Sequence, residues 1–313
     1  MIKLVVAKQE IMEFEPLRTL MDLLAEDSAT SLDDPIGEPM FDPPLVGIAD
    51  AGDPWFARFK EIIGPFYWEP QEALAMAAPG ATARSVICWC LPIGSAARLA
   101  NRRETQVPAR AWAYVRTFGE ELNIRLRQCM VERLASAGFE AVAPSILPQN
   151  TFGEYPGVGI SSFWSERHAA FVAGLGTFGI SGGLITKRGV AHRLGSVITD
   201  ATFSPTLRPY GDDPFAWCLR TARGECGACI ARCPAGSIGE TIEERDKGAC
   251  LHHYADYVGS RCEKVFGWQG IYGCGLCQTD VPCENCNPVV ALQADRSRAQ
   301  GGGGAAPGAL GCS

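Results

Sequence analysis

The concentration of cysteines in the C-terminal third most constrains what this chain can fold into. Ten of the 14 cysteines lie between Cys218 and Cys286. Disulfide frameworks of such density are typical of short secreted chains, whereas this chain has 313 residues and no apolar segment near its start that suits a secretion signal. No run reaches the roughly 18 apolar residues that a membrane-spanning helix needs. We therefore expect a soluble, cytoplasmic protein whose clustered cysteines bind metal.

The spacing of these cysteines indicates which metal. From Cys226 onward the chain contains C-x2-C-x3-C-P. Bacterial ferredoxins bind [4Fe–4S] clusters with the longer run C-x2-C-x2-C-x3-C-P, in which the fourth cysteine ligates the other cluster. Here Arg223 occupies the position of the leading cysteine, so Cys218, five residues earlier, is the expected substitute.

By analogy with this crossed pattern, the region supplies two sets of four thiolates. The first cluster is expected on Cys218, Cys226, Cys229 and Cys283. The second is expected on Cys233, Cys250, Cys274 and Cys277. Cys262 and Cys286 are left over, and Cys286 could replace Cys283 as a ligand. Zinc is the alternative, because the three C-x2-C pairs would also satisfy structural Cys₄ sites.

The region before the cysteines is expected to mix helices and strands. The composition, with 47% hydrophobic and 20% charged residues, is that of a globular protein. Helices are predicted by the apolar spacing of Leu17, Leu20, Met21 and Leu24, by Asp53-Pro54 as an N-cap, and by an apolar face from Val115 to Cys129 that should end near Gly138. The fold class is therefore α+β, with α and β elements intermingled.

Three short runs in this part have β-strand character. They are residues 85–91, 184–186 and 194–199. The last two flank residues 187–189 and are expected to pair with each other across that connection. Cys88, Cys90 and Cys129 are interpreted as small buried hydrophobic residues rather than ligands.

A glycine-rich segment matches G-x-G-x-x-G with Gly174, Gly176 and Gly179. A dinucleotide site requires a strand before this motif and a helix after it. The order here is reversed, because residues 164–173 are helix-like and residues 180–186 lead into a strand. A nicotinamide site is therefore not expected. The glycines instead indicate either close approach of a bulky ligand or a helix C-cap followed by packing glycines.

Several segments between about Pro44 and Pro288 form a series typical of one family. They are Trp164–His168 (WSERH), Ala173–Gly176 (AGLG), Leu184–Thr186, Gly195–Ser196, Cys233–Pro234 and Tyr272–Gln278 (YGCGLCQ). The series resembles the epoxyqueuosine reductases and, more distantly, the reductive dehalogenases. The resemblance implies a nitroreductase-like domain over residues 1–205 and a ferredoxin-type domain with two [4Fe–4S] clusters over 206–290. It also implies a cobalamin between the two, with Gly174, Gly176 and Gly179 lining the corrinoid cavity. Residues 291–313 are expected to form a disordered, glycine-rich tail.

Three departures from this family point away from tRNA as the substrate. The reductases that act on tRNA carry an aspartate general acid six residues before the glutamate that matches Glu166, and here that position is Ile160. They commonly continue into a helical RNA-binding extension, where this chain has its glycine-rich tail. The net charge is −7, and residues 207–288 hold 8 Lys/Arg against 11 Asp/Glu. A small-molecule substrate is therefore expected, with a low-potential electron donor of the ferredoxin or flavodoxin type.

His168 and Glu166 are the candidate catalytic residues. The ordinary pKa of histidine lies near neutral pH, which suits a general acid. Neighbouring helical residues point about 100° apart, so Glu166 and Arg167 are not expected to face one pocket. A structural salt bridge between Glu166 and Arg167 is the favoured interpretation.

Three functions remain open. The first is an iron–sulfur oxidoreductase that passes electrons to a cobalamin and through it to a substrate. The second is a [4Fe–4S] electron-transfer protein that has neither cobalamin nor a substrate of its own. The third is a zinc-stabilised binding module.

Overall fold

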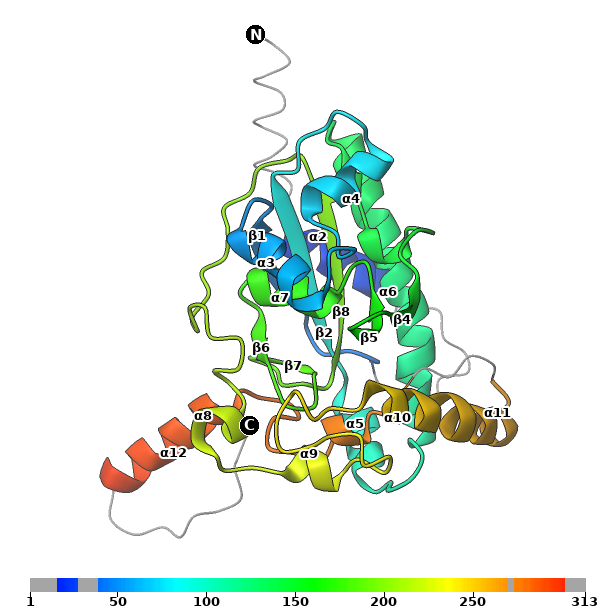
Figure 1. The fold of residues 1–313 in the computed structure, drawn as a ribbon, viewed down its shortest axis with the longest axis vertical. Helices are drawn as coiled ribbons and strands as arrows, with labels where there is room; N and C mark the ends of the chain where they lie inside the picture. The colour runs from blue at the N-terminus through cyan, green and yellow to red at the C-terminus, as the bar shows by residue number, and fades with distance from the viewer. Residues whose placement is uncertain (1–15, 28–38, 269–272, 302–313) are drawn as a thin grey trace.

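A four-stranded antiparallel sheet organises the first part of the chain (Figure 1). The computed structural model describes residues 16–27, 39–268 and 273–301. In the sheet, β1 (Leu45–Asp50), β2 (Ser85–Pro92), β8 (His192–Thr199) and β3 (Ala141–Val142) lie side by side in that order. The sequence of β2, SVICWCLP, is a continuous apolar run, and all its residues are buried. The predicted α+β class is confirmed.

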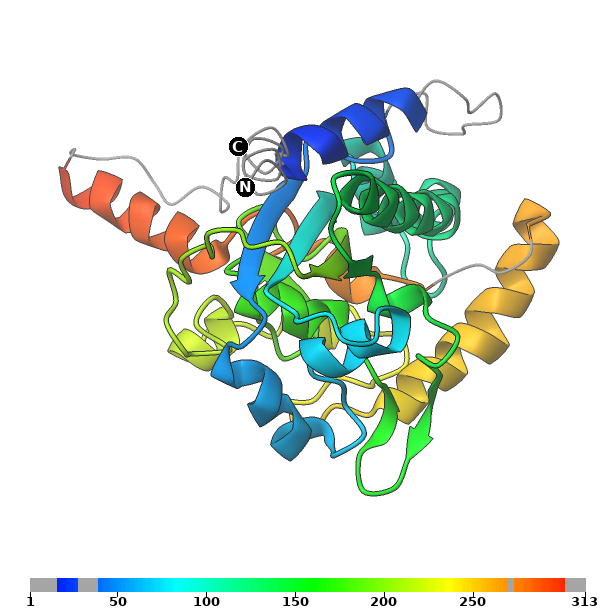
Figure 2. The ribbon, with the colours of Figure 1, turned by 90° about the horizontal axis from the view of Figure 1, so that it is seen from above.

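Helices cover both faces of this sheet, because side chains along a strand point alternately to either side. Val86, Cys88 and Cys90 belong to a core shared with α3 (Pro54–Ile63), α4 (Pro70–Ala77) and α7 (Glu166–Val172). Their neighbours Ile87, Trp89 and Leu91 belong to a second core with α2 (Pro16–Asp27) and α6 (Arg110–Ser136). Figure 2 shows α2 and α6 on the side of the sheet opposite α3 and α4.

The helix predictions for this part are confirmed. The carboxylate of Asp53 caps α3 by accepting a hydrogen bond from the backbone N–H of Trp55 at 3.0 Å. The long helix α6 ends at Ser136, and Gly138 follows with φ +86°. Cys88 and Cys90 are fully buried, while Cys129 is half-buried against the α2–α6 core.

The predicted pairing of residues 184–186 with 194–199 is wrong. Strand β7 (Leu184–Thr186) pairs with β6 (Gly176–Phe178), whereas β8 pairs with β2 and β3. After a tight turn at Gly189, the backbone N–H of Val190 donates to the carbonyl of Cys283 at 2.8 Å. This contact with the cysteine region leads the chain away from β7. A second hairpin, β4 (Phe152–Tyr155) with β5 (Gly159–Ser162), follows the short helix η1 (Pro144–Ile146).

The cysteine region lies beyond one end of the sheet, at the bottom of Figure 1. It consists of short elements joined by loops: α8 (Leu219–Arg223), α9 (Ala228–Ala231), α10 (Lys247–His252), the π-helix η2 (His253–Gly259), α11 (Ser260–Phe266) and η3 (Leu276–Gln278). Trp217, Ile238 and Val281 from this region belong to the same core as Cys88 and Cys90. The two parts of the chain therefore share one core. The expected boundary at residue 205 falls in the irregular segment between β8 and α8.

The predicted disordered tail from residue 291 is wrong for its first part. Helix α12 (Pro288–Gly301) continues through residue 301, and residues 302–313 lie outside the described residues. Proline at the first helical position and the Asn287 side chain, which accepts from the Val289 N–H at 3.1 Å, start this helix. Within the described ranges, no helix is both long and apolar enough to cross a membrane.

Candidate metal centre

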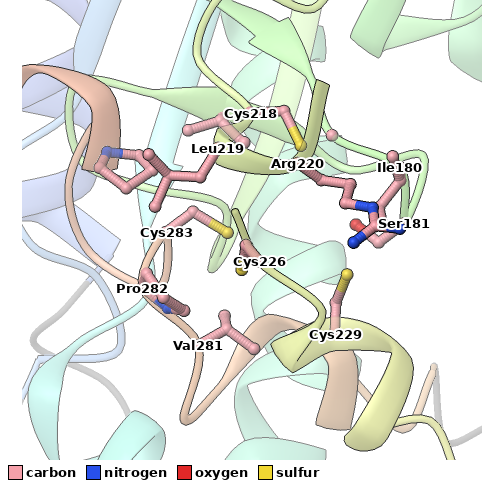
Figure 3. A pocket seen from close by; sticks show the side chains of 13 residues that line it. Ile180, Ser181, Cys218, Leu219, Arg220, Cys226, Cys229, Val281, Pro282 and Cys283 are labelled. Atoms are coloured by element: carbon pink, nitrogen blue, oxygen red, sulfur yellow. The ribbon is translucent and has the colours of Figure 1, made fainter. Parts of the chain in front are cut away.

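Four cysteines from three separate segments line one cavity. Cys218 precedes α8, Cys226 lies in the loop between α8 and α9, Cys229 lies in α9, and Cys283 follows η3. The space that they line measures about 380 Å³, including the part that is open to solvent, and Figure 3 shows their side chains around it. These are the four residues that the sequence assigns to the first cluster.

Local backbone features place these four thiols. Helix α8 ends after one short stretch because Gly224 adopts the left-handed conformation with φ +70°, which turns the chain back toward Cys226. Gly227 precedes α9, in which Cys229 is the second residue. Cys283 is held from the sheet side by the hydrogen bond from Val190.

The thiols of this first group influence one another. Burial, together with the charges of the neighbouring Cys218 and Cys226, raises the pKa of Cys229 to about 12. Burial also raises the pKa of Cys283 well above its usual range, with contributions from Cys229, Cys218 and Cys226. Four thiolates would repel one another here unless a cation stood between them.

A second set of four cysteines is gathered next to α10 and η3. Burial raises the pKa of Cys277, and the next causes are the charges of Cys274, Cys250 and Cys233. The pKa of Cys274 is raised by burial and by Cys250 and Cys233 in the same way. These are the four residues that the sequence assigns to the second cluster. Cys277 and Cys274 are thus influenced by the other members of their expected group, as Cys229 and Cys283 are influenced by members of theirs.

Neither group converges on a single point. Among the residues that the structure describes, no three His, Cys, Asp or Glu side chains come close enough together to hold one metal ion. A zinc ion requires each sulfur about 2.3 Å away. A cubane instead takes one thiolate on each of four iron atoms, and thiols around a cavity match that demand.

Glu284 anchors the loop that carries Cys283, and the sequence analysis missed it. Its side chain is 1% exposed and accepts from Arg98 at 3.1 Å, from Arg102 at 2.8 Å and from the backbone of Asp280 at 2.7 Å. Both arginines lie in α5 (Ser95–Arg102), which follows β2. In the sequence, Glu284 stands out only as a charged residue inside a C-x2-C pair. That position does not show which distant residues it contacts.

The two leftover cysteines lie outside the groups. Cys262 is buried in a small apolar cluster with Ala113 and Val258. Cys286 does not line the cavity, and its sulfur lies 3.6 Å from the carbonyl oxygen of Pro282. The structure thus places Cys283, rather than Cys286, at the first group.

The glycine-rich segment follows the C-terminus of α7 and forms the β6–β7 hairpin, so the expected order, with a helix before the motif and a strand after it, is confirmed. Gly174 has φ +77°, and a Cβ there would lie 2.8 Å from the carbonyl oxygen of Leu207. A Cβ on Gly176 would lie 2.2 Å from the carbonyl oxygen of Ile185. Close packing of the chain on itself therefore requires these two glycines. Gly179 lines the cavity of the first cysteine group.

The expected salt bridge between Glu166 and Arg167 is wrong. Glu166 pairs with Arg127 of α6 at 3.1 Å and also accepts from the hydroxyl of Ser145. Arg167 donates to the carbonyl of Gly182 in the β6–β7 turn. The two side chains diverge because neighbouring helical residues point about 100° apart, as expected.

His168 lies among aromatic rings. Its ring centroid is 4.7 Å from that of Phe59 and 4.9 Å from that of Phe178, and Nδ1 lies 2.7 Å from the hydroxyl of Ser165. Burial, with the charges of Arg167 and Lys247, lowers its pKa to about 3. The ring is therefore neutral at pH 7 and does not supply an imidazolium proton.

Comparison with known proteins gives one kind of match. No protein-family model and no curated protein matches the chain. Solved structures do. An epoxyqueuosine reductase from Streptococcus thermophilus shares 18% identity at a TM-score of 0.42, with 77% of this chain and 62% of that chain covered. An epoxyqueuosine reductase from Bacillus subtilis shares 18% identity at a TM-score of 0.41, with 86% of this chain and 66% of that chain covered.

The chain resembles epoxyqueuosine reductases, as its sequence motifs do. A further solved epoxyqueuosine reductase, bound to an epoxyqueuosine-modified tRNA-Tyr stem loop, is 17% identical at a TM-score of 0.41. The chain spans 62% to 66% of the length of these structures. The backbone carbonyl of Ile160 accepts a hydrogen bond from Lys247 at 3.2 Å.

Proposed function

We propose that the chain is an iron–sulfur oxidoreductase with two [4Fe–4S] clusters. Cys218, Cys226, Cys229 and Cys283 would hold the first cluster. Cys233, Cys250, Cys274 and Cys277 would hold the second. The gathering of eight cysteines into two groups of four, in the crossed order of ferredoxins, is the observation that carries this proposal.

The surroundings of the sulfurs suit clusters in both groups. Backbone N–H groups of Cys229 and Ile230 favour the thiolate of Cys229. The N–H of Ser237 donates to the sulfur of Cys233 at 3.4 Å. Hydrogen bonds to ligand sulfurs tune the reduction potential of iron–sulfur clusters. Bound clusters would supply one-electron transfer, and the chain's own residues would position them and limit their contact with water.

Cobalamin as the electron acceptor extends the proposal, on the strength of the sequence resemblance. Gly179 is the one of the three candidate glycines that borders a cavity, whereas Gly174 and Gly176 contact the chain's own backbone. That contact favours the second candidate function, an electron-transfer protein without a corrinoid. Anaerobic titration of the cluster-loaded protein with cobalamin separates the two: stoichiometric binding with a spectral shift supports the reductase, and no binding supports the electron carrier.

Iron and acid-labile sulfide analysis of the anaerobically reconstituted protein tests the cluster assignment. The substitution Cys229→Ala should remove the first cluster, so that iron and sulfide fall to about half of the wild-type content. The matched control is Cys88→Ala, which removes a thiol buried in β2 and should keep the full content. Full iron and sulfide in Cys229→Ala would overturn the ligand assignment. A wild-type protein that takes up zinc and no iron would overturn the proposal itself.

A further inference from the structure

Two arginine side chains meet at one glycine of the β6–β7 turn. Arg167, from α7, donates to the carbonyl of Gly182. Arg245, from the loop before α10, packs so closely that a Cβ on Gly182 would lie 2.6 Å from its Nη1. Gly182 also has φ +72°, a conformation that favours glycine. The absent side chain leaves room for the guanidinium group of Arg245.

Lys247 brings a third cation to this place. It lies two residues after Arg245, and its ammonium donates to the carbonyl of Ile160 at 3.2 Å. Burial lowers its pKa, and the charges of Arg245 and Arg167 lower it further. We call Arg167, Arg245 and Lys247 the Gly182 cation cluster.

The Gly182 cation cluster has no carboxylate partner among the described residues, unlike several other arginines that are partly or fully buried. The ion pairs of those arginines are Arg98 and Arg102 with Glu284, Arg127 with Glu120 and Glu166, and Arg208 with Asp53. Among the described residues, none of the three cluster members forms an ion pair. The Nε of Arg245 is buried and has no hydrogen-bond partner.

The cluster is accessible, yet it is surrounded by protein. The side chain of Arg167 contacts solvent, and burial among protein atoms nevertheless lowers its pKa to about 10, with Arg245 as the next cause. Arg167 and Lys247 are exposed and Arg245 is half-buried, so an ion in solution can reach the cluster. The cluster adjoins the second cysteine group, because Cys250 acts on Arg167 and Arg245 acts on Cys277.

We propose that the Gly182 cation cluster binds an oxyanion, a phosphate or carboxylate group of the substrate, beside the second cysteine group. Three unpaired cations repel one another, and an anion between them would reverse that repulsion. Two guanidinium groups also offer forked N–H pairs that match the oxygens of phosphate or carboxylate. This inference rests on the proposed function, since it places the anionic end of the substrate within reach of a cluster.

Calorimetric titration of the cluster-loaded protein with inorganic phosphate and with succinate, at constant ionic strength, tests the site. Each of Arg167→Gln and Arg245→Gln should weaken the binding of the preferred anion by about tenfold or more, because each removes charge-assisted hydrogen bonds. The matched control Arg84→Gln removes an exposed charge just before β2, at the end of that strand away from α5 and the cysteine loops. It should change binding less than about twofold.

The ranking of the two anions identifies the chemical class: tighter phosphate binding indicates a phosphorylated ligand and tighter succinate binding a carboxylate. Two results would overturn the site. One is that the wild-type protein binds neither anion. The other is that Arg167→Gln and Arg245→Gln bind like Arg84→Gln while the midpoint potential of one cluster shifts, which would assign the cations to balancing cluster charge. Iron and sulfide content, measured on the same samples, reports separately on the proposed function.

Discussion

The sheet region and the cysteine region stabilise themselves in different ways. In the sheet region β2 is buried along its whole length, and helices close both faces with apolar side chains. In the cysteine region α9 and α10 contain no buried residue, and its eight proposed ligands lie in or beside such short elements. Burial of apolar surface can hold the first region together, at about 25 cal/mol for each Å². The second has little such surface and needs another source of stability.

The same residue type therefore has different roles in the two regions. Cys88 and Cys90 pack in the core as small hydrophobic residues would. Burial raises the pKa of Cys90 to about 12, so its side chain stays a neutral thiol. The pKa of Cys229 is raised to the same extent, but other thiols surround this residue and it lines a cavity. Surroundings, rather than the thiol itself, distinguish a packing cysteine from a candidate ligand.

Removing the clusters should give the largest effect, because it would separate the two regions. Ligation and folding are coupled in small metal-binding modules, so chelation of iron under anaerobic conditions should unfold the cysteine loops and leave the sheet folded. Hydrogen exchange read by mass spectrometry would show lost protection across residues 218–287 and little change in β2 and α6. Equal loss in both regions would mean that the shared core around Trp217 and Val281 couples them into one folding unit.

A single ligand should have the next largest effect. Cys283→Ser should lose the first cluster and the spectral intensity that it contributes, because Cys283 lines the cavity with Cys218, Cys226 and Cys229. Cys286→Ser is the matched control three residues later, and it should keep its iron. If Cys286→Ser lost iron and Cys283→Ser kept it, the two cysteines would have exchanged roles.

The parts of this molecule that depend on local pattern were predictable from the sequence. Asp53-Pro54 caps a helix, and the run 85–91 is a buried strand. These features follow from interactions over a few residues. The strand pairing of residues 184–186 failed because the choice between β6 and β8 depends on the contact of Val190 with Cys283.

The polar partners of the site were not predictable, because they come from distant segments. Arg167 has a neighbour of opposite charge in the sequence, yet Glu166 pairs with Arg127 and Arg167 turns to Gly182. Glu284 meets Arg98 and Arg102 across more than 180 residues. Arg245 lies in the charged run 240–247, in which nothing local distinguishes it from its neighbours. Only the tertiary fold determines which charges in such runs are paired.

Glu284→Gln tests whether polar contacts anchor the cysteine region to the sheet region. Removing one member of a buried ion network leaves Arg98 with only Asp42, 3.9 Å away, as a counter-charge, so we expect a loss of about 3–5 kcal/mol in the free energy of unfolding. Urea denaturation followed by circular dichroism measures it. Glu72→Gln is the control, because Glu72 pairs with Lys60 at the surface of the sheet region, where about 1 kcal/mol or less is expected. Equal losses in the two variants would show that the Glu284 network contributes no more than a surface pair.

The smallest effect concerns the histidine at the start of β8, where the two regions meet. His192 lies beside Leu184, whose carbonyl accepts a hydrogen bond from Nε2 at 2.6 Å, and its Nδ1 is buried without a partner. Burial, together with the charges of Arg116 and Arg167, lowers its pKa to about 4, although the hydrogen bond to Leu184 offsets part of this effect. The folded protein therefore keeps this ring neutral at pH values where the unfolded chain protonates it.

Between about pH 6.5 and pH 4 the unfolded chain binds more protons at His192 than the folded protein does, so the free energy of unfolding falls as the pH falls. The contribution is complete above pH 6.5, and about 2 kcal/mol of it should be lost between pH 7 and pH 5. The variant His192→Gln has no side chain that titrates at this position, so its free energy of unfolding should fall less between pH 7 and pH 5. Urea denaturation at the two pH values measures this difference. His168, whose pKa is lowered in the same direction, keeps part of the acid sensitivity in both proteins. The exposed His252 supplies the control His252→Gln, which should follow the wild type. If His192→Gln lost as much stability as the wild type, the folded protein would bind a proton at His192 as readily as the unfolded chain does. The boundary between the two regions would then be more open to water than its packing indicates.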